Sequence, residues 1–117
     1  MTIMAVNNCS ESLLLLYKLL RKAFPDDEIL TFTDPFFAVQ YSNQNKVDIA
    51  FIEMDVRPID SDVISRLIRK FNKNVKVYLL MGTEIRNSGL TKSDAANCIM
   101  TPVSADAIRE LARHNAG

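Results

Sequence analysis

The chain has 117 residues, of which 48% are hydrophobic and 24% are charged, a mixture that indicates one globular domain spanning residues 1–117. Its 14 Lys and Arg residues balance its 14 Asp and Glu residues, so the formal net charge is zero. Proteins that bind nucleic acids usually carry a basic face. We therefore expect no direct contact between this domain and nucleic acid.

Targeting signals and metal-ligand patterns are both missing from the sequence. The first residues lack the pattern of a signal peptide, and the apolar run at residues 13–17 is too short to cross a bilayer. Cys9, Cys98 and the single histidine, His114, are not spaced as a zinc site. We expect a cytoplasmic protein with no membrane partner and no disulfide framework.

In chain order, the apolar residues alternate between the spacing of strands and that of helices. Residues 2–6 predict a first strand, and residues 10–24 predict a first helix. Asn8 and Glu11 have the arrangement of a capping box, so Asn8 is the expected N-cap of this helix. Residues 28–32 predict a second strand.

The middle of the chain repeats this alternation. A second helix begins at Thr33-Asp34-Pro35, where proline is tolerated, and ends in a polar exit over residues 42–46. Residues 47–52 predict a third strand, and their apolar character indicates that helices cover both of its faces. Asp60 or Ser61 then caps a helix that continues to about Phe71.

Residues 75–81 predict a fourth strand, and residues 82–94 are polar and predict at most a short or irregular helix. Residues 98–100 predict a fifth strand, and Ser104 caps a last helix through about Arg113. Five strands that alternate with five helices predict an α/β fold, in which a parallel sheet carries helices on both faces. Such proteins bind ligands at the carboxyl ends of their strands.

Over nearly its whole length the sequence resembles the receiver domains of bacterial response regulators. The first strand and Asn7-Asn8 occupy the place of a strand that ends in two acids in that family. Residues 47–56 (VDIAFIEMDV) resemble the third strand and the phospho-acceptor loop, and Thr101-Pro102 stands where the family has Lys-Pro, usually joined by a cis bond. The resemblance implies a CheY-like, flavodoxin-like sheet with strand order 2-1-3-4-5.

A narrower resemblance concerns the setting of the domain. Residues 32–35 (FTDP) and 102–109 (PVSADAIR) are similar to receivers joined to LytTR-type DNA-binding domains in Firmicutes. This implies transcription regulation, with a C-terminal DNA-binding domain in a longer chain as one possibility. The expected partner is another protein or a second copy, bound through the last helix and the neighbouring strand.

The chemistry of receivers uses five side chains: two acids that bind Mg²⁺, an acceptor Asp, a Ser or Thr after the fourth strand, and a Lys before the proline. This sequence has Asn7, Asn8, Glu53, Met81 and Thr101 at those positions. Neutral amides weaken the attraction for Mg²⁺, Met81 cannot donate a hydrogen bond, and Thr101 lacks the charge of lysine. The predicted function is therefore that of a pseudo-receiver, which has no catalytic residue, metal or cofactor and signals through protein contacts.

Two alternatives stay open at the acceptor loop. Glu53 is either an ordinary acid at a strand end or a permanent mimic of the phosphoryl charge. Asp55 could join it in a weak Mg²⁺ site, because the family uses the main-chain carbonyl of that position as a metal ligand. The alternative function is thus a working phosphorelay receiver that uses Glu53 or Asp55 as acceptor.

The remaining candidates are the cysteines and one charged segment. Cys98 stands at the position of the switch aromatic and is interpreted as a core residue. A regulatory thiol at either Cys9 or Cys98 is the less favoured hypothesis. A further hypothesis places a small-ligand pocket beside Met81 and Cys98, and a decayed, purely structural domain is its alternative. The basic residues of the third helix region are interpreted as a solvated face: Arg66, Arg69, Lys70 and Lys73.

Overall fold

The computed structural model describes residues 1–81, 98–101 and 103–115, in which five strands alternate with helices. The strands are β1 (Thr2–Val6), β2 (Glu28–Phe32), β3 (Ile49–Glu53), β4 (Lys76–Met81) and β5 (Cys98–Met100). The helices within the described ranges are α1 (Ser10–Ala23), α2 (Pro35–Gln44), α3 (Ser61–Phe71) and α5 (Ala105–Asn115). The predicted weak helix over residues 82–94 and the expected cis bond before Pro102 lie outside the described residues.

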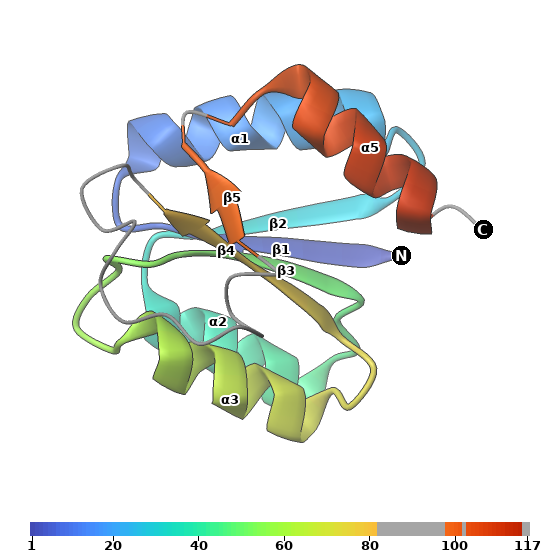
Figure 1. Ribbon diagram of the computed structural model, residues 1–117. Coiled ribbons are helices and arrows are strands. Elements are labelled where there is room, and N and C mark those ends of the chain that lie inside the picture. The colour runs from blue at the N-terminus through green and yellow to red at the C-terminus, as the bar shows by residue number, and fades with distance from the viewer. Residues whose placement is uncertain (82–97, 102, 116–117) are drawn as a thin grey trace.

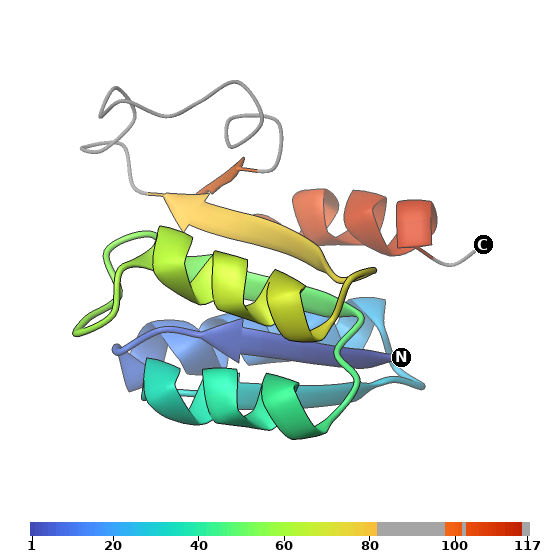
Figure 2. The same ribbon diagram turned by 90° about the horizontal axis from the view of Figure 1, so that it is seen from below.

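The five strands form one sheet in the order β2-β1-β3-β4-β5, and every neighbouring pair is parallel. In Figure 1, α1 and α5 lie on one face of the sheet, and α2 and α3 lie on the other. Figure 2 looks onto α2 and α3 and shows β1 and β4 running in the same direction. The predicted fold class and strand order are confirmed.

Two hydrophobic layers hold the helices on the sheet, and β3 contributes to both. Its residues Ala50 and Ile52 are buried in the layer beneath α2 and α3, whereas Ile49 and Phe51 are buried in the layer beneath α1 and α5. Adjacent residues of a strand point to opposite faces, so one apolar segment supplies both layers. The prediction of a central strand covered on both sides is confirmed.

The predicted start of the third strand and the predicted end of the second helix are wrong, and hydrogen bonds explain both. The third strand begins at Ile49 and not at Val47, because the main-chain N–H of Val47 donates to Oδ1 of Asn72 at 2.9 Å. The polar segment expected as the exit of α2 is partly helical, since the buried Ser42 satisfies its hydroxyl by donating to the Val39 carbonyl at 2.7 Å. The helix therefore continues to Gln44.

Three of the four predicted helix starts agree with the structure, and for α3 the N-cap is Asp60. Asp34 caps α2 by accepting from the N–H of Phe36, and Ser104 caps α5 by accepting from the N–H of Ala107. The prediction that Asn8 caps α1 is wrong: the N-cap is Cys9, whose side chain makes no capping hydrogen bond. In the described residues, no helix combines the length and the hydropathy that a membrane span needs.

Candidate functional site

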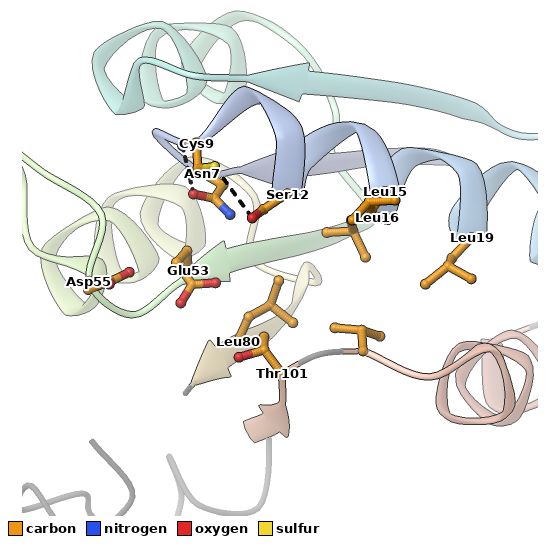
Figure 3. A pocket seen from close by; sticks show the side chains of 11 residues that line it. Asn7, Cys9, Ser12, Leu15, Leu16, Leu19, Glu53, Asp55, Leu80 and Thr101 are labelled. Atoms are coloured by element: carbon orange, nitrogen blue, oxygen red, sulfur yellow. Dashed lines mark hydrogen bonds between the residues drawn. The ribbon is translucent and has the colours of Figure 1, made fainter. Parts of the chain in front are cut away.

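The carboxyl ends of the central strands border a pocket of about 310 Å³ beside the first turns of α1 (Figure 3). Its polar lining consists of Asn7, Cys9, Ser12, Glu53, Asp55 and Thr101. Its apolar lining consists of Leu15, Leu16, Leu19, Leu80 and Val103. The pocket lies where parallel α/β sheets present their functional residues, because all strands end at the same edge.

Asn8 is tied to the loops that surround this edge and does not line the pocket. Its Nδ2 donates to the carbonyl oxygens of Thr33 at 3.0 Å and Arg57 at 2.8 Å. Its Oδ1 accepts from the N–H of Arg57 at 2.7 Å. One amide thereby joins the loops that follow β1, β2 and β3, which explains why Asn8 is not the cap of α1.

Asn7 turns the nitrogen end of its amide toward the pocket (Figure 3). Its Oδ1 accepts from the N–H of Cys9 at 2.9 Å, which fixes the orientation of the amide. If the amide were rotated, Nδ2 would face the Cys9 N–H, and two donors would oppose each other. At this position the pocket therefore meets a hydrogen-bond donor and no anionic oxygen.

Glu53 ends β3 and presents a partly buried carboxyl to the pocket. Burial away from water, followed by the negative charge of nearby Asp55, raises the pKa of Glu53 to about 7. Asp55 itself is exposed and lies at the rim. At neutral pH the Glu53 carboxyl is thus divided between its neutral and ionised forms, unlike an ordinary surface acid.

Thr101, which follows β5, lines the pocket with its hydroxyl committed to the backbone. The hydroxyl donates to the carbonyl oxygen of Met81 at 3.3 Å, and the Thr101 N–H donates to the same oxygen at 2.9 Å. Because its hydrogen is used in this bond, the hydroxyl oxygen has only lone pairs to offer to a ligand. Thr101 adds an acceptor and no positive charge where the receiver family has a lysine.

Met81 and Cys98 do not line this pocket, so the hypothesis that they border it is wrong. Leu80, and not Met81, pairs with Glu53 in the sheet and shares its face. Met81 is buried on the opposite face, because side chains alternate along a strand. Cys98 is partly buried and packs against the hydrophobic layer beneath α2 and α3.

The apolar wall of the pocket was not predicted from the sequence. In α1, Leu13, Leu16 and Leu20 are buried. Leu15 and Leu19 are four residues apart and therefore form a second apolar stripe. Four consecutive leucines at residues 13–16 were the available signal, since one buried stripe cannot use them all.

The remaining charged candidates lie away from the pocket. The basic residues of the α3 region are exposed, and Arg66 pairs with Asp62 of the same helix at 3.3 Å, so the prediction of a solvated face is confirmed. Asp60 pairs with Arg57 at 3.7 Å and makes no side-chain cap on α3. Cys9, in contrast, lines the pocket: its exposed sulfur accepts from the Ser12 hydroxyl at 3.4 Å, which lowers the pKa of its thiol.

The side chains do not fit the Mg²⁺ ion that a receiver pocket implies. Mg²⁺ requires hard, preferably anionic oxygens in near-octahedral arrangement. Asn7 directs nitrogen at the pocket, and Asn8 uses its oxygen on Arg57. Among the residues that the structure describes, no three His, Cys, Asp or Glu side chains gather in an arrangement that could hold a metal ion.

The sequence matches no protein-family model and no curated protein. Among solved structures, the fold is similar to the signal receiver domain of a DNA-binding response regulator from Colwellia psychrerythraea 34H, with TM-score 0.80, 18% identity, and coverage of 98% of this chain and 97% of that one. It is also similar to a response regulator receiver domain protein from Clostridium thermocellum, with TM-score 0.78, 19% identity, and coverage of 97% and 91%.

A third similar structure, described as adenylate cyclase from Rhodopirellula baltica, has TM-score 0.78 and 14% identity over 97% of this chain and 84% of that one. Identities this low establish the fold and not the activity. The chain therefore has the CheY-like fold of response-regulator receiver domains.

Proposed function

We propose that the chain is a pseudo-receiver: a signalling domain of the two-component type that acts through protein contacts and without standard aspartyl phosphorylation. The orientation of the two asparagine side chains at the carboxyl end of β1 carries this proposal. Asn7 presents a donor to the pocket, and all three hydrogen bonds of Asn8 hold loops together. Neither side chain is available as an anionic ligand for Mg²⁺, on which phosphoryl transfer depends.

The proposed partner surface is formed by α5 and the neighbouring strand β5. On α5, Ile108 is fully buried and anchors the helix on the sheet. Arg109, Glu110 and Arg113 are exposed on its outer side and offer charges of both signs. A second copy of the chain, or a protein with complementary charges, is the proposed occupant. The setting we favour is transcription regulation, with any DNA contact made by another domain or another protein.

An NMR titration of the isotope-labelled chain tests the loss of phosphorylation chemistry. Mg²⁺ is added first, followed by Mg²⁺ with beryllofluoride, which imitates a phosphoryl group on a carboxylate. We expect no saturable shift at the amides of Glu53, Leu80 and Thr101 up to about 10 mM Mg²⁺, because the site lacks two of its anionic ligands. Saturable shifts at these three residues would overturn the proposal.

A second measurement addresses the alternative of a working phosphorelay receiver. The chain is incubated with a small-molecule phosphodonor and Mg²⁺, and its intact mass is recorded before and after acid treatment. The proposal predicts no phosphoryl adduct, because no Lys, Arg or His stands beside the partly buried Glu53 among the described residues that line the pocket. Asp55 is exposed at the rim, away from the buried position that in-line transfer to an acceptor requires. An adduct that Glu53→Gln or Asp55→Asn abolishes would make the chain a phosphorelay receiver.

A further inference from the structure

The pocket beside α1 has a polar end that offers mostly hydrogen-bond acceptors. The Ser12 hydroxyl donates its hydrogen to the sulfur of Cys9, and the Thr101 hydroxyl donates its hydrogen to the Met81 carbonyl. Each hydroxyl oxygen therefore presents lone pairs to the pocket. Glu53 and Asp55 add carboxyl oxygens, whereas the Asn7 amide nitrogen adds a donor. Among the described lining residues, no lysine, arginine or histidine faces these oxygens. Such an end favours a ligand group rich in N–H donors and disfavours phosphate or carboxylate.

The other end of the pocket is apolar and partly open. Leu15 is 65% exposed although it belongs to a helix that packs on the sheet, and Leu19 and Val103 are partly buried beside it. An exposed leucine on the wall of a hollow loses water contact when a hydrocarbon group fills that hollow. The volume of about 310 Å³ is at the small end of the range of ligand pockets.

We propose that this pocket binds a small amphipathic organic cation, an amine whose ammonium group lies between Glu53 and Thr101 and whose hydrocarbon chain lies along Leu15, Leu19 and Val103. An ammonium group brings three N–H donors and a positive charge to the acceptor-rich end. Its hydrocarbon chain covers the leucine wall. The inference rests on the proposed function in one respect, namely that the pocket does not hold Mg²⁺ and a phosphoryl group. Binding of the amine would then replace phosphorylation as the signal that the domain receives.

Hexylammonium chloride is the probe for this proposal, titrated into the labelled 117-residue chain at pH 8 and followed by NMR. We expect saturable shifts at Leu15, Glu53 and Thr101, with a dissociation constant on the order of 1–10 mM for so small a ligand. Methylammonium lacks the chain and should bind at least about tenfold more weakly. Hexanoate reverses the charge and should cause no saturable shift at these residues.

Two variants test the two ends of the pocket, and each has a matched control. Leu15→Ser should weaken hexylammonium binding about fivefold or more, because it removes apolar wall from the site. Leu14→Ser changes the neighbouring leucine, which is 53% exposed and does not line this pocket, and should leave the affinity unchanged. Glu53→Gln should weaken binding roughly tenfold, because a neutral amide replaces a charge-assisted partner, whereas Glu11→Gln, on the exposed first turn of α1, should not.

The outcomes separate this inference from the proposed function. Equal binding of hexanol and hexylammonium, or shifts with hexanoate, would overturn the assignment of a cation. Equal effects of Leu15→Ser and Leu14→Ser, or the absence of saturable shifts with hexylammonium, would overturn the site itself. Saturable shifts with Mg²⁺ and beryllofluoride would instead overturn the proposed function, whatever hexylammonium does.

Discussion

The carboxyl of Glu53 couples the stability of the fold to pH. The folded chain keeps the Glu53 proton up to about pH 7, because burial and the charge of Asp55 disfavour the carboxylate. In the unfolded chain an ordinary glutamate releases its proton near pH 4.3. Between these values the folded state binds more protons than the unfolded state, so the stability of the wild type falls as the pH rises through this window.

Glu53→Gln should therefore flatten the pH profile of stability. At pH 5 the variant and the wild type should have similar free energies of unfolding, and at pH 8 the variant should be more stable by about 1–2 kcal/mol. Each unit of pKa shift corresponds to about 1.4 kcal/mol, and partial exposure of the carboxyl reduces the full effect. Urea unfolding at a series of pH values measures this difference.

Glu11→Gln is the control, since it removes the same charge from an exposed position on α1. It should keep the slope of the wild type. A wild-type stability that rises between pH 5 and pH 8, or a Glu53→Gln variant with an unchanged slope, would contradict an elevated pKa at Glu53.

The positions of single pocket residues could be predicted where those residues stand at the carboxyl end of a strand. Asn7, Glu53 and Thr101 directly follow or end strands, and parallel strands bring such positions to one edge. The partner of an amide is not fixed in this way. Asn8 fits a capping pattern in the sequence, yet its hydrogen bonds go to Thr33 and Arg57, which are 25 and 49 residues away. Local patterns carry no information about such contacts.

At the scale of elements, Asn8 acts as the junction of three strand-to-helix loops. Restoring the acid that receivers usually have there, by Asn8→Asp, should destabilise the fold. A carboxylate oxygen would replace Nδ2 and face the carbonyl oxygens of Thr33 and Arg57, which now accept from it at 3.0 and 2.8 Å. We expect a loss of about 1–2 kcal/mol in the free energy of unfolding, because two hydrogen bonds are replaced by repulsion.

Asn74→Asp provides the comparison, because Asn74 is exposed in the turn before β4. This variant should change the free energy of unfolding by less than about 0.5 kcal/mol. Urea unfolding at pH 7 measures both variants, and equal stabilities for Asn8→Asp and the wild type would mean that Asn8 does not hold the loops.

The elements themselves were largely predictable, because each has a strong local signal. β1, β2 and β5 have the predicted bounds, and α3 extends from Ser61 to the predicted end at Phe71. One error lies where a distant side chain decides the boundary, as Asn72 does at the start of β3. Leu15 shows the same limit for packing: four consecutive leucines indicate that α1 has more than one apolar side, but not which of them borders a hollow.

At the scale of the whole molecule, the sheet gathers the ends of β1, β3, β4 and β5 around one pocket, so a single charge there should govern the response of the entire fold to divalent ions. Asn7→Asp tests this. The variant keeps an oxygen that accepts from the Cys9 N–H and turns a second, anionic oxygen toward Glu53 and Asp55. Like charges at close range destabilise the folded state, so its melting temperature without Mg²⁺ should fall by about 3–6 °C.

Added Mg²⁺ should reverse that loss in Asn7→Asp and leave the wild type unchanged. With a dissociation constant near 1 mM, about 10 mM Mg²⁺ stabilises the folded state by about 1.4 kcal/mol, which raises the melting temperature by several degrees. The wild type should shift by less than about 1 °C. Asn7→Ala loses the same nitrogen without adding charge and should not respond to Mg²⁺. A wild type that Mg²⁺ stabilises as strongly as Asn7→Asp would show that the asparagine at residue 7 does not prevent metal binding, and the pocket would then retain the ion chemistry of a working receiver.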